Sequence, residues 1–317
     1  MVIALLAVFL FPGASRAEPS LAWPQRTVKL VVPLGPASGA DVTARLLADQ
    51  LSRRWGQPVV VENRPGADGI VGVTAFLGGA DDHALLFAPT GAFTASPLVH
   101  QNLTFKPDRL APIARVTNTL IAISVPAALK VNSLAELMAF IEQHPGRSHW
   151  ASNTGATDLV FSAFLKSAGL SMVRVPYRDG VLAANDLSEG RIEVFVSALA
   201  AVLPLATSGR IRILALTNRE RTATMAEVPT VVEAGYPALQ YDGLAGLFTT
   251  VATPAAQRER IASDVRASIA DPAVALRIAA TGQVVSPGGP AEFADAIAEQ
   301  SAAFIAIAKS LGLRPQQ

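Results

Sequence analysis

The sequence predicts an α/β protein that folds into two lobes, each a mainly parallel sheet covered by helices. From Trp23 onward, short runs rich in β-branched residues alternate with stretches whose apolar residues recur every three or four positions. This alternation is typical of strands joined by helical crossovers. The length of 317 residues is more than one hydrophobic core usually serves, so we expect the chain to divide between two cores.

The N-terminal part holds a β-α-β-α-β series, which favours parallel pairing because each crossover helix returns the chain to the same edge of the sheet. The helix at 41–55 is predicted from apolar residues that fall on one helical face, and Asn63 to Gly66 ends the strand that follows it. The series comprises strands at 27–33, 59–61 and 84–88 and helices at 41–55 and 69–77.

The middle and C-terminal parts repeat this pattern. Ser133 and Glu136 form a capping box that begins a helix, and Thr253-Pro254 begins the first of two terminal helices. The remaining predicted elements are strands at 120–125, 149–152, 172–176, 192–196, 213–217 and 244–249 and helices at 161–168 and 181–189.

The predicted lobes are discontinuous in sequence. We place the chain crossings in the strands near 120–125 and 242–248. Residues 23–123 and 244–317 then form the first lobe, and residues 124–243 form the second.

The N-terminus resembles a secretion signal. An unbroken apolar run from Val2 to Phe11 is followed by Pro12-Gly13 and by the small-x-small sequence at 15–17. We predict a signal peptide at 1–17 that is cleaved near Ala17. No Lys or Arg precedes the apolar run, and the alternative is an N-terminal helix packed on the core.

Composition and motifs argue against an enzyme, a metalloprotein and a nucleic-acid-binding protein. Charged residues make up 16% and the formal net charge is +1, whereas phosphate backbones require a basic surface. The absence of cysteine excludes disulfides and thiol nucleophiles, and the four histidines show no metal-ligand spacing. The G-x-x-G-x-x-G sequence at 66–72 departs from the dinucleotide motif G-x-G-x-x-G. We expect no catalytic residue, no metal, no cofactor and no nucleic-acid partner.

Three loops at strand ends are candidates for ligand binding. The segments 35–41, 89–92 and 152–157 are rich in Gly, Ser, Thr and Asn, and each precedes a predicted helix. Small residues let a ligand approach the backbone, and the first amides of a helix favour anions. The loops therefore predict an anion site without Lys or Arg. The alternative is that each loop only caps its helix, since every such turn uses small residues.

Four stretches of the chain, in order, resemble one family. They are the residues WP with KLVVP and Asp41 at 23–41, VVVENRPGADG at 59–69, VPYR with NDL at 175–187, and EVPTVVEAGYP at 227–237. Together they are similar to the Bug family, the periplasmic solute-binding components of tripartite tricarboxylate transporters, from about Trp23 to Leu313.

The resemblance implies a two-lobed periplasmic-binding-protein fold, type II-like, that closes around a small carboxylate and presents it to a membrane permease. It implies a non-enzymatic, monomeric, periplasmic protein. The alternative is a sensing protein whose closed form is recognised by a sensor kinase. Carried over by position, the implied ligand-binding residues are Leu34, Ser38, Gly39, Asp41, Thr90, Gly91, Ser152, Asn153, Thr154, Thr157, Tyr177 and Ser197.

The chain also departs from the family pattern. Ala37-Ser38 stands where the family usually has Gly-Gly, Ser197 where it commonly has Asp or Asn, and Leu244-Ala245 where an aromatic residue is common. The differences at Ser197 and at Leu244-Ala245 change the half of the pocket away from the carboxylate. The carboxylate-anchoring end is therefore the safer inference. Asp41 has the alternative role of favouring a helix N-terminus, and Tyr177 that of a core residue near the hinge.

Overall fold

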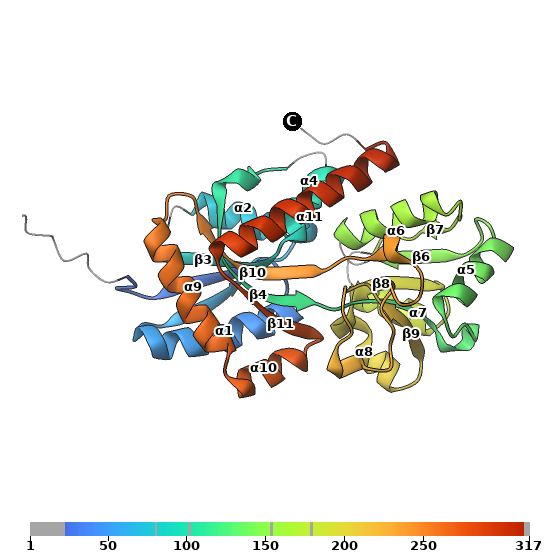
Figure 1. Cartoon of the computed structure of the whole chain (residues 1–317), viewed down its shortest axis with the longest axis horizontal. Coiled ribbons are helices and arrows are strands. Elements are labelled where there is room, and N and C mark those ends of the chain that lie inside the picture. The colour runs from blue at the N-terminus through green and yellow to red at the C-terminus, as the bar shows by residue number, and fades with distance from the viewer. Residues whose placement is uncertain (1–22, 80, 101–102, 153–154, 178–179, 314–317) are drawn as a thin grey trace, which may run out of the picture.

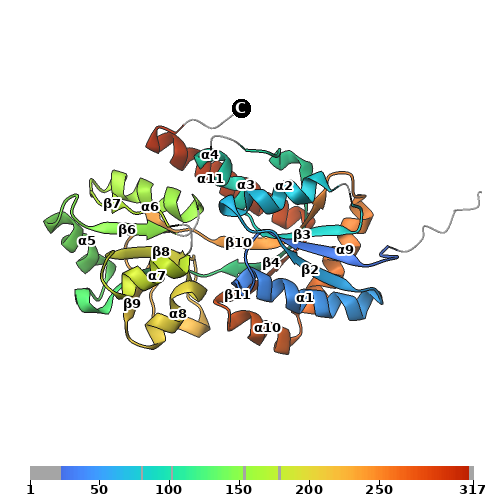
Figure 2. The same cartoon turned by 180° about the vertical axis from the view of Figure 1, so that it is seen from behind.

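The computed structural model describes residues 23–79, 81–100, 103–152, 155–177 and 180–313. It forms two α/β lobes, each with its own sheet, joined by extended segments that pass between them (Figures 1 and 2). The prediction of a two-lobed α/β fold is confirmed. The predicted signal peptide and the predicted site residues Asn153 and Thr154 lie outside the described residues.

The first lobe contains a six-stranded sheet in the order β11-β4-β10-β3-β1-β2. Apolar residues of α1, α9 and α10 cover one face of it, and those of α2, α3 and α11 cover the other. Both views show α1 and α10 on the opposite side of the sheet from α2 and α11 (Figures 1 and 2). The elements are β1 (Val28–Val32), α1 (Gly39–Trp55), β2 (Val59–Asn63), α2 (Ile70–Gly78), β3 (Ala84–Pro89), α3 (Gly91–Thr94), α4 (Ser96–Val99), β4 (Leu110–Thr119), β10 (Gly243–Thr250), α9 (Ala255–Ile269), α10 (Pro272–Ala279), β11 (Gln283–Gly288) and α11 (Pro290–Leu311), with short 3-10 turns at Ala67–Gly69 and Pro107–Arg109.

The second lobe contains a five-stranded sheet in the order β7-β6-β8-β5-β9. Helices α5 and α6 pack on one face, and α7 and α8 pack on the other. The elements are β5 (Ile121–Pro126), α5 (Leu134–Gln143), β6 (His149–Ser152), α6 (Gly155–Ser167), β7 (Val173–Arg174), α7 (Gly180–Ser188), β8 (Val194–Ala198), α8 (Leu199–Thr207) and β9 (Ile211–Leu216), with 3-10 turns at Ala127–Leu129, Ala223–Met225 and Pro237–Leu239.

The expectation of mainly parallel sheets was wrong, because both sheets are mixed. Strand β1 pairs with β2 and β3 in parallel, and β6 pairs with β7 and β8 in parallel. The pairs β3–β10, β4–β10, β4–β11, β5–β8 and β5–β9 are antiparallel. The cause lies in the crossing strands: β4 carries the chain towards the second lobe and β10 carries it back, so the two run in opposite directions.

The chain changes sheet at two tight points. Leu120 separates β4 from β5; its amide donates to the carbonyl of Gly282 at 3.0 Å, and its carbonyl accepts from Leu199 at 2.8 Å. On the return, the amide of Tyr241 donates to the carbonyl of Thr217 at 2.9 Å just before β10 begins. The predicted domain ranges of 23–123, 124–243 and 244–317 stay a prediction. The chain passes from one sheet to the other close to each of the two predicted boundaries.

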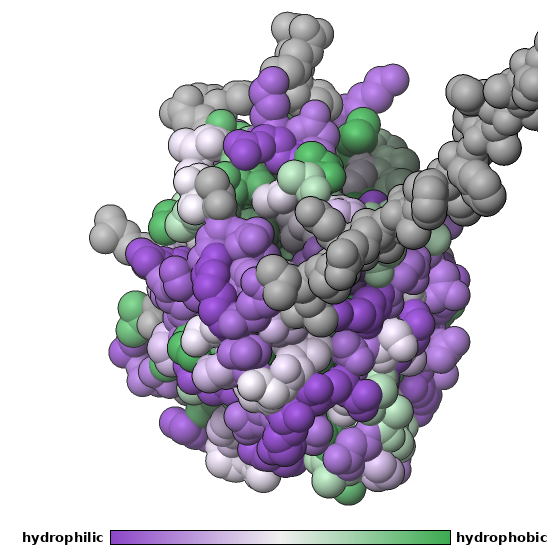
Figure 3. Space-filling model, turned by 90° about the vertical axis from the view of Figure 1, so that its left-hand side faces the viewer, coloured by the Kyte–Doolittle hydropathy of each residue, from purple (hydrophilic) through white to green (hydrophobic). Residues whose placement is uncertain are grey.

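The surface of the first lobe is largely hydrophilic on the end that faces away from the second lobe (Figure 3). Among the helices that the structure describes, none is both long enough and apolar enough to cross a membrane.

Candidate ligand-binding cleft

The predicted site loops follow the parallel strands of both lobes and face one another. Two close approaches between the lobes show where the lobes meet. A Cβ added to Gly91, at the start of α3, would lie 3.3 Å from the Cβ of Ala156 in α6. A Cβ added to Gly282 would lie 3.1 Å from the Cβ of Leu199 in α8. Since the carboxyl ends of parallel strands are where open α/β sheets bind ligands, the region between these two contacts, where the loops of the two lobes meet, is the candidate site, here called the cleft.

The β1–α1 loop presents unpaired backbone amides. Ser38 is the N-cap of α1, with extended backbone, and its hydroxyl accepts a hydrogen bond from the amide of Asp41 at 3.2 Å. The amides of Gly39 and Ala40 have no acceptor within the described ranges. A Cβ on Gly39 would lie 2.9 Å from Nε2 of Gln283 and 3.2 Å from the carbonyl oxygen of Thr281, so a side chain here would displace the buried side chain of Gln283. The start of this long helix can therefore receive an anion.

Asp41 holds the loop in place and has little capacity left for a ligand. It is buried, and its carboxylate accepts hydrogen bonds from the amide of Ala37 at 2.9 Å, from Nδ2 of Asn63 at 2.8 Å and from the guanidinium of Arg45. Burial raises the pKa of the Asp41 carboxyl, but the hydrogen bonds from Arg45, Asn63 and Ala37 together outweigh it and hold the pKa below its usual value. Of the two roles considered for Asp41, the structure favours support of the helix N-terminus.

Replacing Asp41 by asparagine is expected to destabilise the protein by about 3 kcal/mol at neutral pH, because buried donors lose a charged acceptor. A lowered pKa stabilises the fold above the ordinary pKa of aspartate, and this stabilisation is lost as the pH falls through the folded-state pKa. The difference between wild type and Asp41→Asn in urea unfolding should therefore shrink below about pH 4. Asp49→Asn, at an exposed aspartate of the same helix, is the control. A constant difference down to pH 2.5 would contradict the ionic role of Asp41.

Ala37, at one departure from the family pattern, has a strained backbone. Its φ of +64° lies in the left-handed region, where a residue with a Cβ costs about 1–2 kcal/mol. A glycine, as the family usually has near this point, would adopt this conformation freely. The amide of Ala37 donates to Asp41 at 2.9 Å, so the carboxylate offsets part of the strain in the loop.

The β3–α3 loop is fixed by a buried network rather than by exposed donors. Thr90 is fully buried, and its hydroxyl donates to Oε1 of Gln300 in α11 at 2.5 Å. The hydroxyl of Thr94 donates to the same oxygen at 3.0 Å, and Nε2 of Gln300 donates to the carbonyl of Asp242 at 3.0 Å. The side chain of Thr90 thus points towards α11, and the part of this loop that meets the second lobe is Gly91.

In the second lobe, the structure separates the predicted residues into buried and accessible ones. Thr157 and Ser197 are buried. Ser152 ends β6, and Tyr177 follows β7; both are partly exposed and line a cavity of about 380 Å³. The cavity lies between the lobes, because residues of the first lobe also line it: Asp68, Val99, His100, Leu311 and Leu313, together with Gly155, Asp158, Leu159, Ser162 and Arg174 of the second.

The hydroxyl of Tyr177 has a partner within its own lobe. It donates to the carboxylate of Asp186 at 2.6 Å, and Arg191 pairs with the same carboxylate at 2.6 Å. Burial, followed by the hydrogen bond to Asp186, raises the pKa of Tyr177 to about 12. Tyr177 therefore stays protonated, and its ring forms part of the cavity wall.

Leu34, the remaining predicted residue, is partly buried against the core of the first lobe, and its carbonyl accepts from Nδ2 of Asn63 at 3.0 Å.

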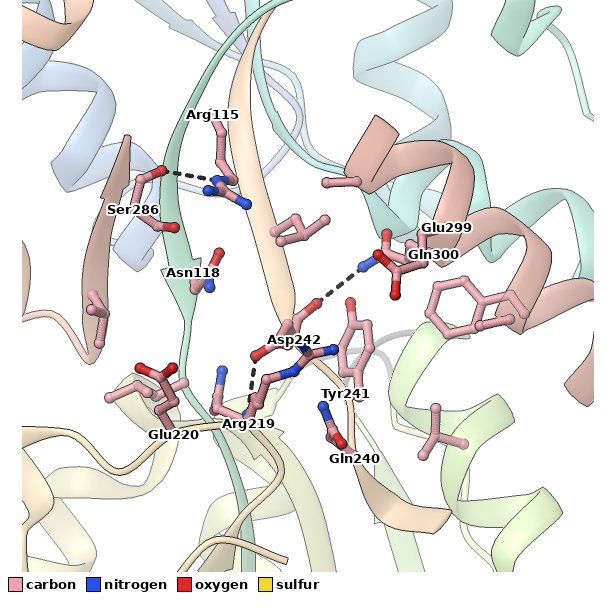
Figure 4. A pocket seen from close by; sticks show the side chains of 18 of the residues that line it. Arg115, Asn118, Arg219, Glu220, Gln240, Tyr241, Asp242, Ser286, Glu299 and Gln300 are labelled. Carbon is pink, nitrogen blue, oxygen red and sulfur yellow. Dashed lines mark hydrogen bonds between the residues drawn. The ribbon is translucent and has the colours of Figure 1, made fainter. Parts of the chain in front are cut away.

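A second pocket, of about 530 Å³, was not predicted from the sequence (Figure 4). It lies beside the crossing strands, and none of the predicted site residues that the structure describes lines it. Arg115 and Asn118 enter it from β4, Asp242 from the segment before β10, and Glu299 and Gln300 from α11 (Figure 4). The segments come from distant parts of the chain, and each residue alone is an ordinary polar residue, so no local pattern marks them.

Asp81, Asp82 and His83 offer ligand atoms within 4.8 Å of one another, which is close enough for a metal ion. Their groups already have protein partners: Arg26 pairs with both carboxylates at 2.8 Å, and the amide of Gln25 donates to Nε2 of His83 at 3.1 Å. The cluster attaches the start of the described chain to the turn before β3.

The comparisons with known proteins agree with this architecture. The model of the tripartite tricarboxylate transporter family receptor (TctC) matches residues 43–313. Protein BugT of Bordetella pertussis is 31% identical over 242 residues, which cover 74% of each chain. Among solved structures, Rpa4515 of R. palustris with adipate is 27% identical, with a TM-score of 0.84 over 93% of this chain and 100% of that one. MatC of Rhodopseudomonas palustris with bound malate is 25% identical, with a TM-score of 0.79 over 90% of this chain and 100% of that one.

Two α/β lobes with a cavity between them are the architecture of a solute-binding protein. The chain belongs to the tripartite tricarboxylate transporter receptor family, which includes the Bug proteins. The members of this family are periplasmic solute-binding proteins and not enzymes, and the predicted resemblance is confirmed.

Proposed function

We propose that this protein captures a small carboxylate in the cleft between its lobes. The observation that carries the proposal is the start of α1, where the amides of Gly39 and Ala40 have no acceptor among the described residues and Ser38 caps the helix without charge. A carboxylate there accepts backbone hydrogen bonds and benefits from the positive end of the helix dipole. Binding of adipate and malate by the related Rpa4515 and MatC supports this ligand class.

In this proposal Ser38, Gly39 and Gly91 contact or border the ligand in the first lobe, and Ser152 and Tyr177 do so in the second. Asp41, Thr90, Thr157 and Ser197 shape these loops, with Leu34 behind them. Asn153 and Thr154 stay predictions. Closure is a hinge motion at the two points where the chain changes sheet, near Leu120 and Tyr241.

The proposed setting is the periplasm, after removal of residues 1–17, where the closed monomer delivers its solute to the membrane permease of a tripartite transporter. The family of the chain supports this setting and this partner.

Native mass spectrometry of the chain from Glu18, purified without denaturation, tests the proposal. We expect a monomer carrying one small acid, or an empty monomer whose melting temperature rises with adipate, malate or another member of a panel of mono-, di- and tricarboxylates. Amines and sugars of similar size are the control ligands. An empty protein that no carboxylate stabilises would contradict carboxylate capture.

A further inference from the structure

The pocket beside the crossing strands, here called the hinge pocket, is separate from the cleft. In the first sheet, β11 and β4 line the hinge pocket, whereas the cleft loops follow β3 and β1 on the other side of β10. The second lobe contributes the loop at 218–221. The hinge pocket has a volume of about 530 Å³, which is within the range of pockets that bind small molecules.

Two irregularities in β4 direct polar side chains into this pocket. Residues three apart on a regular strand point to opposite faces, yet Arg115 and Asn118 both line the hinge pocket. The register against β10 shifts between Ala245 and Gly246, so that Val116 is an extra residue, and the register against β11 shifts between Val285 and Gly288. Bulges of this kind re-aim side chains and are frequent beside binding sites.

Arg115 and Asn118 have unused hydrogen-bonding capacity there. Nε of Arg115 donates to the carbonyl of Ser286 at 3.1 Å, which fixes the guanidinium, while its terminal nitrogens have no partner among the described residues (Figure 4). Oδ1 of Asn118 is buried and has no hydrogen-bond partner among the described residues. Buried polar atoms are normally paired, so an unpaired one at a pocket wall points to a bound molecule.

The pocket also holds an unpaired negative charge. Asp242 is partly buried, and its carboxylate accepts only the amide of Arg219, at 3.3 Å, from the described residues. Arg115 and Asp242 lie apart in the pocket, and neither forms an ion pair within 4.0 Å with a residue that the structure describes (Figure 4). Two partly buried charges of opposite sign that do not neutralise each other suit a ligand that carries both complementary charges.

We propose that the hinge pocket binds an amino acid, or a zwitterion of the same kind, at a second site distinct from the cleft. The carboxylate of the ligand lies against Arg115, and its ammonium group lies against Asp242, with Oδ1 of Asn118 as a further acceptor for an N–H donor. Tyr241 forms part of the pocket wall, and its hydroxyl lies 3.6 Å from the position of a Cβ on Gly91. A ligand in the hinge pocket therefore contacts a residue that reaches the cleft.

Calorimetric titration of the chain from Glu18 with each of the twenty common amino acids tests the site. We expect at least one to bind, and its deamino acid and its decarboxylated amine to bind at least tenfold more weakly. Arg115→Gln and Asp242→Asn should each lower the affinity at least tenfold. The controls are Arg147→Gln and Asp49→Asn, at exposed positions, and they should match wild type. If Arg115→Gln does not fold, Arg115→Lys, which keeps the charge, is measured in its place.

The outcomes separate this site from the cleft. Carboxylate binding in the cleft should survive Arg115→Gln, whatever the fate of amino-acid binding. Binding of no amino acid, or binding that Arg115→Gln, Arg115→Lys and Asp242→Asn leave unchanged, overturns the proposal. Amino-acid binding that Ser38→Asp abolishes and Arg115→Gln preserves would place that ligand in the cleft, and this too overturns it.

Discussion

Replacement of Ser38 by aspartate is expected to lower the affinity for a carboxylate solute about thirtyfold or more while the fold stays intact. Aspartate caps a helix as well as serine does, so the amide of Asp41 keeps its acceptor. The new carboxylate, however, stands at the free amides of Gly39 and Ala40, where the carboxylate of the solute is proposed to bind. Repulsion between the two charges, with competition for the same donors, is worth about 2 kcal/mol or more.

Ser38→Asn is the matched control, because asparagine also caps the helix but carries no charge. The affinity of both variants for the carboxylate identified by mass spectrometry is measured by calorimetry, and their stability by thermal unfolding. Equal affinity of Ser38→Asp and Ser38→Asn would show that the start of α1 does not hold the carboxylate.

Replacement of Gly246 by alanine is expected to destabilise the protein by about 4 kcal/mol or more, an unusually large effect for a single methyl group. Gly246 lies in β10, the central crossing strand. A Cβ there would be 2.3 Å from the carbonyl oxygen of Ala114 and 2.5 Å from the ring of Phe293. The first obstacle belongs to β4 and the second to α11, so neither can move without separating β10 from its neighbouring strand or from the helix that covers it.

Gly78→Ala is the control for this substitution. Gly78 is the last residue of α2, and a Cβ there meets nothing within 4 Å. Its stability should stay within about 1 kcal/mol of wild type, since alanine is the better helix former. Unfolding in guanidinium chloride compares the two variants. A loss of less than 1 kcal/mol in Gly246→Ala would mean that β10 and α11 can part at little cost.

Elements with strong local signals could be predicted from the sequence, and those that depend on their neighbours could not. The helix at Gly39–Trp55 has clear periodicity and the strand at Ala84–Pro89 is a continuous apolar run, so neither prediction depended on neighbouring segments. The strand at Leu110–Thr119 was not predicted, because its bulges break the alternation by which strands are recognised. Its partner at Gln283–Gly288 was missed for the same reason.

For the candidate site, too, local features could be predicted and long-range contacts could not. The sequence predicted three loops as candidates for the site, because a loop between a strand and a helix is a local feature. It could not show which partners each side chain of these loops has. Thr90 is paired with Gln300, 210 residues further along the chain, and Tyr177 is paired with Asp186. The hinge pocket was missed entirely, because Arg115 and Asp242 come together only through the crossing of β4 and β10.

The discontinuity of the first lobe has a consequence for the order in which the protein can be assembled during synthesis. The second lobe is made of one continuous stretch, so its sheet can form once β9 has emerged. The first sheet cannot, because β10 lies between β3 and β4 and is among the last segments to be made. The N-terminal half of that lobe therefore waits, incomplete, until α11 has left the ribosome. For a chain exported as we propose, this arrangement delays completion of the fold until synthesis is nearly finished.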